Sequence, residues 1–367
     1  MKRFLGFLLL LLVALPLSPA QAADRVIRIT SAAHQTFTGE FRNDDLAQEL
    51  TPSGQLGKLV FTPKVAHTTW VIDAALIDEV IAMTGEYSLI SEAPTIGKDI
   101  ASAWLKQLRQ ITYGQQVVAL AYGNPDVTLA KKLAPSELKK YFEFGKSQLE
   151  IALGRTVRSE PNTMWSSGKS RLSNELRKGY GDNRKALTRL SKVVNDPELN
   201  MVRSQLSKLL SPQLDKDSRE YFSYSARAAV DALVHKLRIN SGKYQITTSF
   251  VKLPVTVINE FDVPVTVDVA MLPINSRVIV ESFQGVTIPA RSKKQLEMPV
   301  DVIAPGQTTV SAIITDSKGN DVVPEATLTL NSTVIDSRVT WFTTGAAILL
   351  LLAAVAQSVR RVRKRSK

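Results

Sequence analysis

The sequence contains no cysteine among its 367 residues. This absence excludes disulfide bonds, thiol catalysis, cysteine metal sites and a lipid anchor on cysteine. The three histidines, His34, His67 and His235, lack metal-ligand spacing. No serine lies in the Gly-x-Ser-x-Gly pattern of serine hydrolases, and no segment repeats with a period of about 20 to 50 residues. We therefore expect no metal site and no cofactor, and a fold that depends on its hydrophobic core.

The first residues have the order of a secretory signal peptide. Lys2 and Arg3 precede an apolar run over residues 4–15, and Ala20-Gln21-Ala22 supplies the small residues of a cleavage site. The sequence thus predicts a signal peptide over residues 1–22 and export of the mature chain from the cytoplasm.

A second apolar segment, residues 339–359, contains no charged side chain. At about 1.5 Å per residue, it is long enough to cross a bilayer core of roughly 30 Å. Aromatic residues at its start and basic residues at its end are typical of a membrane anchor with a cytoplasmic tail over 360–367. The residues concerned are Trp341, Phe342, Arg360, Arg361, Arg363, Lys364, Arg365 and Lys367. We therefore predict a single-pass type I protein of the cell membrane, with the lipid bilayer as a partner.

The net charge of +12 at first suggests a nucleic-acid-binding protein. Two positive charges belong to the predicted signal peptide and six to the predicted tail, which leaves +4 for the region between them. Basic residues beside a membrane segment bind anionic lipid. The charge distribution therefore favours a membrane partner and no nucleic acid.

The C-terminal part before the apolar segment alternates between apolar and polar residues. Eight stretches rich in Val, Ile and Thr, separated by turn residues, predict an antiparallel immunoglobulin-like β-sandwich over 241–335. These stretches are 244–248, 253–259, 263–272, 277–281, 286–288, 295–303, 308–315 and 326–331. Such sandwiches usually bind, space or support other domains.

The N-terminal part predicts an α/β domain over 23–134 that resembles part of a (β/α) barrel. Its expected strands are 26–29, 59–61, 69–72 and 117–120, and its expected helices have Leu76, Val80 and Met83 on one face and Ile100, Trp104, Leu108 and Ile111 on another. Residues 135–240 predict a helical region continuing the same domain. In that region we expect helices around Leu138 to Leu149, Asp196 to Leu209 and Tyr221 to Leu237, and loops at 156–170 and 179–184.

Two aspartates follow the predicted strands of the α/β domain. Asp73 directly follows the strand over 69–72, and Asp126 follows the strand over 117–120 after a short turn. Carboxylates beyond the C-terminal ends of parallel strands can act as acid and base on a glycosidic bond. Asp73 and Asp126 also occupy positions where a helix N-cap is expected, and capping is our preferred interpretation. Trp70 and Tyr122 could stack on sugar rings or pack in the core.

Basic residues recur between Lys169 and Lys192, alternating with acidic residues and leucines. The simplest interpretation is a solvated helix face. Contact with anionic polymers of the cell envelope is the alternative.

Several segments occur in the order seen in the domain of unknown function 6049 family of actinobacterial envelope proteins. They are Thr69 to Leu76, Ala103-Trp104-Leu105, Val118 to Asp126, Leu253 to Asn259 and Pro264 to Val267. The chain resembles this family from about Asp45 to the C-terminus. It differs in having Ala74 and Ala121 in place of prolines, Asn124 in place of an acidic residue, and a shorter barrel-like region.

The resemblance implies a secreted, single-pass protein that acts at the cell wall, often encoded beside the lipid II flippase. Our leading hypothesis is a non-enzymatic envelope protein that binds or scaffolds peptidoglycan precursors, cell-wall glycan, the flippase or another membrane protein. The alternative is a glycan-active enzyme that uses Asp73 and Asp126.

Overall fold

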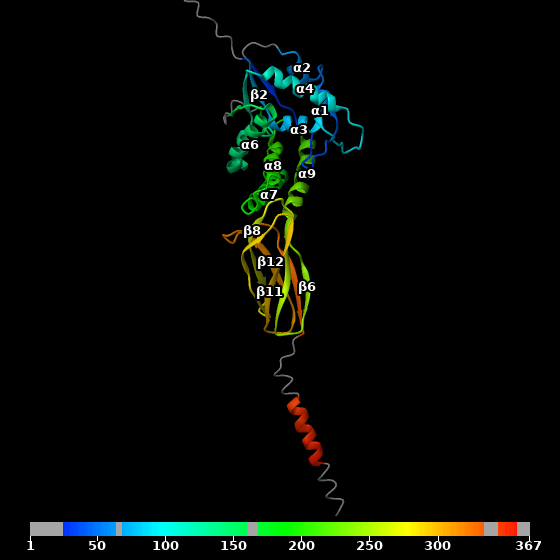
Figure 1. Cartoon of the computed structure of the whole chain (residues 1–367), viewed down its shortest axis with the longest axis vertical. Helices are drawn as coiled ribbons and strands as arrows, with labels where there is room; N and C mark the ends of the chain where they lie inside the picture. Colours follow the sequence, from blue (N-terminus) through cyan, green and yellow to red (C-terminus); the bar gives the residue numbers. More distant parts are fainter. Residues whose placement is uncertain (1–24, 64–67, 160–167, 334–343, 358–367) are drawn as a thin grey trace, which may run out of the picture.

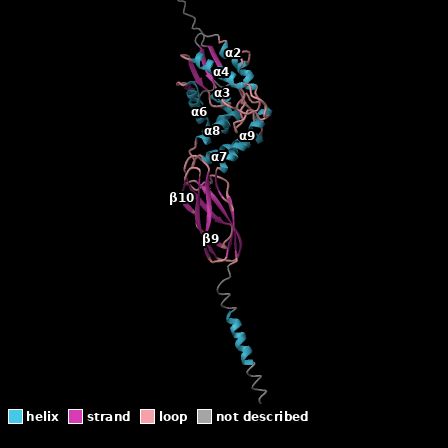
Figure 2. Ribbon diagram, turned by 45° about the vertical axis from the view of Figure 1, so that its right-hand side comes forward, coloured by secondary structure: helices cyan, strands magenta, loops and turns pink. Residues whose placement is uncertain are grey.

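A computed structural model describes residues 25–63, 68–159, 168–333 and 344–357. The described residues up to 333 form a small parallel sheet with its helices, a second group of helices, and a two-sheet β-sandwich, arranged one after another along the long axis (Figures 1 and 2). The expected mixture of helices and strands is therefore present.

The first sheet contains four parallel strands in consecutive order. They are β1 (Arg25–Ile29), β2 (Thr68–Ile72), β3 (Gln116–Ala119) and β4 (Arg158–Ser159). Every residue of β2 is buried, because the strand has neighbours on both edges and helices pack against the sheet. Parallel strands need crossover connections, which the intervening helices provide. The structure therefore shows an open α/β layer of four parallel strands.

The helices that accompany this sheet are α1 (Asp45–Leu50), α2 (Gln55–Phe61), α3 (Ala74–Thr84), α4 (Gly97–Thr112), α5 (Val127–Leu133) and α6 (Pro135–Leu153). Trp104 of α4 is fully buried, and its indole donates a hydrogen bond of 3.2 Å to the Leu56 carbonyl of α2. Helix α6 lies close to the end of β3 because Gly145 has no side chain. A Cβ at Gly145 would lie 2.4 Å from the Leu120 carbonyl oxygen.

A second group of helices forms the middle of the molecule. It consists of α7 (Asn174–Leu190), α8 (Pro197–Gln205), the 3-10 helix η2 (Leu206–Leu210) and α9 (Lys216–His235). Ser173, Asp196 and Asp215 cap α7, α8 and α9 through hydrogen bonds to backbone amides. A buried bidentate ion pair joins α8 to α6, with both Arg203 to Glu137 nitrogen–oxygen distances at 2.7 Å.

The sandwich consists of a five-stranded sheet in the order β10-β8-β12-β13-β6 and a four-stranded sheet in the order β5-β7-β11-β9. All eight predicted strand segments are confirmed as strands. The strands are β5 (Leu237–Ile239), β6 (Gly242–Ile246), β7 (Phe250–Asn259), β8 (Val265–Pro273), β9 (Val278–Val280), β10 (Phe283–Ile288), β11 (Ser292–Val302), β12 (Gly306–Thr315) and β13 (Ala326–Ser332).

Helix α9 runs almost directly into the sandwich. It ends at His235, and β5 begins at Leu237 and pairs with β7. The buried residues of the middle helices and of the sandwich belong to one continuous hydrophobic cluster. The two regions therefore share a core.

Four local predictions were wrong. Within the loop expected at 156–170, Arg158–Ser159 form the short strand β4 beside β3, and residues 160–167 lie outside the described residues. Residues 59–61 lie in α2 instead of a strand, because Leu56 and Val60 are buried at helical spacing. Residues 179–184 lie inside α7 instead of a loop, since the helix buries Tyr180, Asn183 and Leu187 despite two glycines. The last helix ends at His235, and the stretch at Leu237 that was expected to be helical is the additional sandwich strand β5.

The predicted signal peptide, the aromatic residues Trp341 and Phe342, and the tail from Arg360 onward lie outside the described residues. Of the predicted membrane segment, residues 344–357 are described and helical. No helix in the described ranges has both the length and the hydropathy needed to span a membrane.

The close approach of α6 to β3 leads to a test of packing. Gly145→Ala should lower the free energy of unfolding by roughly 1–3 kcal/mol, because the new methyl group would meet backbone atoms that cannot move independently. Gly181→Ala in α7 is the control, since a Cβ there meets no atom within 4 Å. This control should raise stability by about 0.5–1 kcal/mol. Urea denaturation of both variants measures the difference, and equal effects would contradict the packing assignment.

Candidate functional site

Asp73 and Asp126 both cap helices. The Asp73 Oδ1 atom accepts hydrogen bonds from the backbone amides of Ala75 (3.0 Å) and Gly123 (2.9 Å). The Asp126 Oδ1 atom accepts from the amides of Thr128 and Leu129 at the start of α5. Its Oδ2 atom accepts from the Ser170 amide at 2.8 Å. Each carboxyl group therefore holds backbone segments together, as an N-cap does.

Asp73 belongs to a buried polar cluster at the C-terminal ends of β2 and β3. We call Asp73, Asp78, Glu79, Tyr122 and Lys208 the strand-end cluster. The Lys208 ammonium lies 2.7 Å from the Glu79 carboxylate, and both side chains are almost fully buried. The Tyr122 hydroxyl donates a hydrogen bond of 2.9 Å to Asp78. The sequence did not identify Asp78, Glu79 or Lys208 as site residues. Asp78 and Glu79 lie in α3, and their partner Lys208 comes from η2, 129 residues after Glu79.

Burial shifts the proton equilibria of this cluster. Loss of hydration raises the pKa of Asp73 to about 7, against the opposing effects of its two backbone hydrogen bonds and of Lys208. Burial also raises the pKa of Asp78 to about 6. The pKa of Tyr122 lies well above its ordinary value, mainly through burial and secondly through the charge of Asp78.

The strand-end cluster has no room for a substrate. The cavity beside Asp73, Glu79, Gly123 and Lys208 has a volume of about 10 Å³, which is space for one water molecule. A Cβ on Gly123 would lie 2.8 Å from the Lys208 backbone nitrogen, so η2 packs directly on the turn after β3. Raised carboxyl pKa values resemble those of catalytic acids, but this cluster is closed to a sugar ring.

Trp70 and Tyr122, the candidate stacking residues, lie in the core. Trp70 is fully buried and Tyr122 is 1% exposed. The Tyr122 ring packs edge-to-face against Phe144, with ring centroids 4.9 Å apart. Neither aromatic ring presents a face to solvent.

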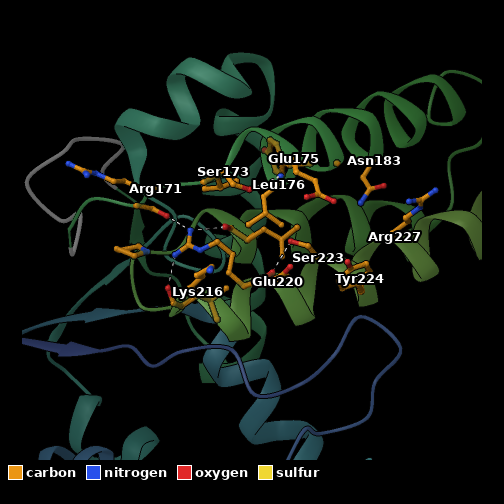
Figure 3. A pocket seen from close by; sticks show the side chains of 18 of the residues that line it. Arg171, Ser173, Glu175, Leu176, Asn183, Lys216, Glu220, Ser223, Tyr224 and Arg227 are labelled. Atoms are coloured by element: carbon orange, nitrogen blue, oxygen red, sulfur yellow. Dashed lines mark hydrogen bonds between the residues drawn. The ribbon is translucent and has the colours of Figure 1, made fainter.

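A large open pocket lies between α7 and α9, and we call it the α7–α9 pocket (Figure 3). Its volume is about 860 Å³, a size that suits a small-molecule or oligomeric ligand. Its lining includes a group of buried apolar side chains: Leu172, Tyr180, Leu209 and Leu214. Polar and charged side chains from both helices surround them.

The rim of the α7–α9 pocket has more positive than negative charge. Its positive residues are Lys169, Arg171, Lys216 and Arg227, and its negative residues are Glu175 and Glu220. Lys169, Arg171 and Lys216 are exposed and form no ion pair with any other described residue. Arg219 differs, because it is buried and its guanidinium donates to the carbonyls of Leu209, Ser211 and Leu214. Arg219 therefore maintains the wall of the pocket, and the exposed cations remain available to a ligand.

Asn183 presents a polar group to this pocket. The residue is 9% exposed, and within the described parts of the chain its side-chain amide makes no hydrogen bond, because its polar atoms remain accessible to water. Figure 3 shows the amide directed from α7 toward the space between the helices, near Arg227 and Tyr224. An amide that faces a pocket without a protein partner is available to a ligand. The basic residues from Lys169 onward were the sequence signal for this site, but nothing in the sequence distinguished Asn183.

The raised pKa of Asp73 leads to a pH prediction. Between about pH 4 and pH 7 the folded protein keeps a proton on Asp73 that the unfolded chain, with its ordinary pKa of 3.8, has lost. The free energy contributed by this group therefore falls as pH rises through that range. Asp73→Asn retains the Oδ1 acceptor but cannot titrate. Urea unfolding across this range should show a smaller loss of stability with rising pH in Asp73→Asn than in the wild type, and parallel profiles would contradict the shift.

The buried ion pair between Lys208 and Glu79 leads to a second prediction for this cluster. Lys208→Met should lower the free energy of unfolding by about 3–5 kcal/mol, because Glu79 would remain buried without its counter-charge. The double variant Lys208→Met/Glu79→Gln should recover a large part of that loss, since it removes both charges. Denaturation of the two variants measures the coupling, and purely additive effects would show that the ion pair is not the stabilising unit.

Solved structures similar to this chain share only a part of it. WR4, a C. elegans MSP family member, is 14% identical over 27% of this chain and 98% of its own, with a TM-score of 0.20. The PapD-like domain of human CEP192 is 8% identical over 28% of this chain and 87% of its own, with a TM-score of 0.21. Likenesses at these scores carry no argument about fold or function. No match to the chain is found among curated proteins.

A family model matches a larger part of the chain than these solved structures do. A model described as a family of unknown function, DUF6049, matches residues 155–366. This range contains α7, α8, α9 and the whole sandwich, and it excludes Asp73 and Asp126. Because the match covers more than half of the chain, the chain belongs to the DUF6049 family of unknown function.

Proposed function

We propose that this chain is a membrane-anchored, extracytoplasmic binding protein that holds an anionic glycan of the cell envelope in the α7–α9 pocket and performs no catalysis there. The observation that carries the proposal is an open pocket with an excess of exposed cations on its rim, toward which the Asn183 amide is directed (Figure 3). The polar atoms of this amide are accessible to water and have no partner in the described structure. A ligand that displaces this water can pair with both the donor and the acceptor of the amide.

The chemistry of the pocket supports an acidic saccharide. An amide offers both a donor and an acceptor, which suits adjacent hydroxyl groups. Tyr224, 66% exposed beside Asn183 and Arg227 (Figure 3), offers an aromatic face for a sugar ring. Arg171 and Lys216 lie toward the other end of the pocket and provide charge for a carboxylate or phosphate.

Placement at a membrane is supported by the sequence signals at both ends and by the helix over 344–357. Its apolar side chains are exposed, with Leu349, Leu350 and Leu351 each more than 60% accessible. Such a helix is unfavourable in water and favourable in lipid. In this arrangement the sandwich spaces the pocket from the bilayer. Envelope membrane proteins, including the lipid II flippase, are the further candidate partners.

The glycan-active alternative has less support. Asp73 has the raised pKa of a general acid, but its Oδ1 atom accepts two backbone hydrogen bonds and its surroundings admit one water. Asp126 is engaged through both carboxylate oxygens. Hydrolysis by these residues would require η2 to move away from the strand ends.

Binding can be tested with soluble, anionic peptidoglycan fragments from an enzymatic wall digest, titrated into the full chain. We expect salt-sensitive binding, and a roughly tenfold weaker affinity in Arg171→Glu, equivalent to about 1.4 kcal/mol. Arg177→Glu is the matched control, because Arg177 is an exposed arginine of α7 outside the pocket lining.

Asn183→Leu separates recognition from folding. It removes an amide that has no partner in the described structure, so the free energy of unfolding should stay equal or rise. Affinity for the fragments should fall by roughly tenfold, the value of one good hydrogen bond. Absence of binding by the wild type, or equal weakening in Arg177→Glu and Arg171→Glu, would exclude the proposed site.

A further inference from the structure

The exposed apolar side chains of the sandwich gather at one end. Between residues 237 and 333, the large hydrophobic residues that are strongly exposed are Phe250 (53%), Leu272 (52%), Ile274 (71%), Ile279 (57%) and Ile303 (63%). All five lie toward the end opposite the helices. We call Phe250, Ile274, Ile279 and Ile303 the distal apolar end.

Strand pairing brings these four residues together. Asp301 of β11 pairs with Phe250 on one side and with Ile279 on the other. The Ile303 amide donates a hydrogen bond of 2.8 Å to the Arg277 carbonyl, in the connection that also contains Ile274. The connections at 274–277 and 303–305 therefore present Ile274 and Ile303 at the same end, where Phe250 begins β7 and Ile279 lies in the short strand β9.

The opposite end of the sandwich has a different character. Its turns carry ion pairs, among them Arg291 with Asp262 and Lys192 of the helical region with Asp316. Asp316 also accepts hydrogen bonds from Asn320, which hold its pKa well below the usual range. Turns that carry ion pairs are normal at the surface of a domain. The exposed apolar side chains at the distal end require a separate explanation.

The chain leaves the sandwich at the distal apolar end. The Thr333 amide donates a hydrogen bond of 2.9 Å to the Ile246 carbonyl, and Ser332 pairs with Gly306 beside residues 303–305. The helix over 344–357, with its exposed apolar side chains, begins eleven residues after position 333. Eleven residues span at most about 40 Å. If that helix lies in a bilayer, the distal apolar end is tethered within that distance of it.

We infer that the distal apolar end inserts into the membrane interface, with Phe250, Ile274, Ile279 and Ile303 as the side chains in contact with lipid. This inference rests on the membrane anchor of the proposed function. The site consists of two loop residues, Ile274 and Ile303, and two strand residues, Phe250 and Ile279, at the end of the sandwich where the chain leaves it. Anchor and loops together would fix the direction in which the sandwich extends from the bilayer.

The absence of native cysteines permits a direct test by single-cysteine spin labelling of the full chain. Phe250→Cys, Ile279→Cys and Ile303→Cys carry a nitroxide, and the chain is reconstituted in phosphatidylcholine and phosphatidylglycerol vesicles. Oxygen concentrates in the bilayer and a nickel chelate stays in water. The measured quantity is the ratio of the label's collision rate with oxygen to its collision rate with the nickel chelate. At all three sites this ratio should be higher in vesicles than in the urea-solubilised chain.

Two further labels make the outcomes distinguishable. Tyr113→Cys, at an 81% exposed position after α4, should remain accessible to nickel, and Leu350→Cys should be protected from it. Protection at 350 with full nickel access at 250, 279 and 303 would overturn the inference and leave the anchor intact. Nickel access at 350 would overturn the anchor and this inference together. Adding Ile303→Glu to the Phe250→Cys chain should reduce the protection at 250.

Discussion

The buried contact between Lys208 and Glu79 determines how the two halves of the helical region meet. Lys208 comes from η2 and Glu79 from α3, so the 2.7 Å ion pair ties the C-terminal edge of the parallel sheet to the helices that follow α6. Glu79 also accepts a hydrogen bond from the His34 amide at 3.0 Å, which adds the loop after β1. Three distant segments therefore converge on one carboxylate. A buried charge without this pairing would be strongly unfavourable, which gives the arrangement its specificity.

This contact has opposite consequences for the two candidate sites. On one side, η2 covers the strand ends, and the resulting loss of hydration raises the pKa values of Asp73 and Asp78. On the other side, the chain leaving η2 provides Leu209, Pro212 and Leu214 to the α7–α9 pocket. The segment that seals the position of a barrel active site thus forms a wall of the open pocket. The pocket that we propose for binding lies beside the parallel sheet and its helices, in the region that the family match covers.

Local signals in the sequence were sufficient for much of the fold and for little of the site. Alternating patterns predicted the sandwich strands because each buries one face, and Asp73 and Asp126 were identifiable as caps because an N-cap depends on the next few residues alone. Residues 59–61 were misassigned because a short apolar run has no distinctive period. Lys208 and Asn183 were not predictable as site residues. The role of Lys208 depends on a contact with Glu79, 129 residues away, and the role of Asn183 depends on its position at a pocket formed by distant segments.

The continuity of the hydrophobic core connects the pocket to the proposed membrane end. Helix α9 contributes Arg219, Ser223 and Tyr224 to the pocket and then passes into β5 with one residue between them. Its carboxyl end is held to the sandwich by backbone bonding of Lys236 to Glu260 and by side-chain pairing of Arg238 with Glu260. Because the buried side chains form one cluster across this junction, bending there would expose apolar surface and is opposed by the hydrophobic effect. An orientation imposed on the sandwich at a lipid surface would therefore be transmitted to the α7–α9 pocket, which would face a defined direction at a fixed height above the bilayer.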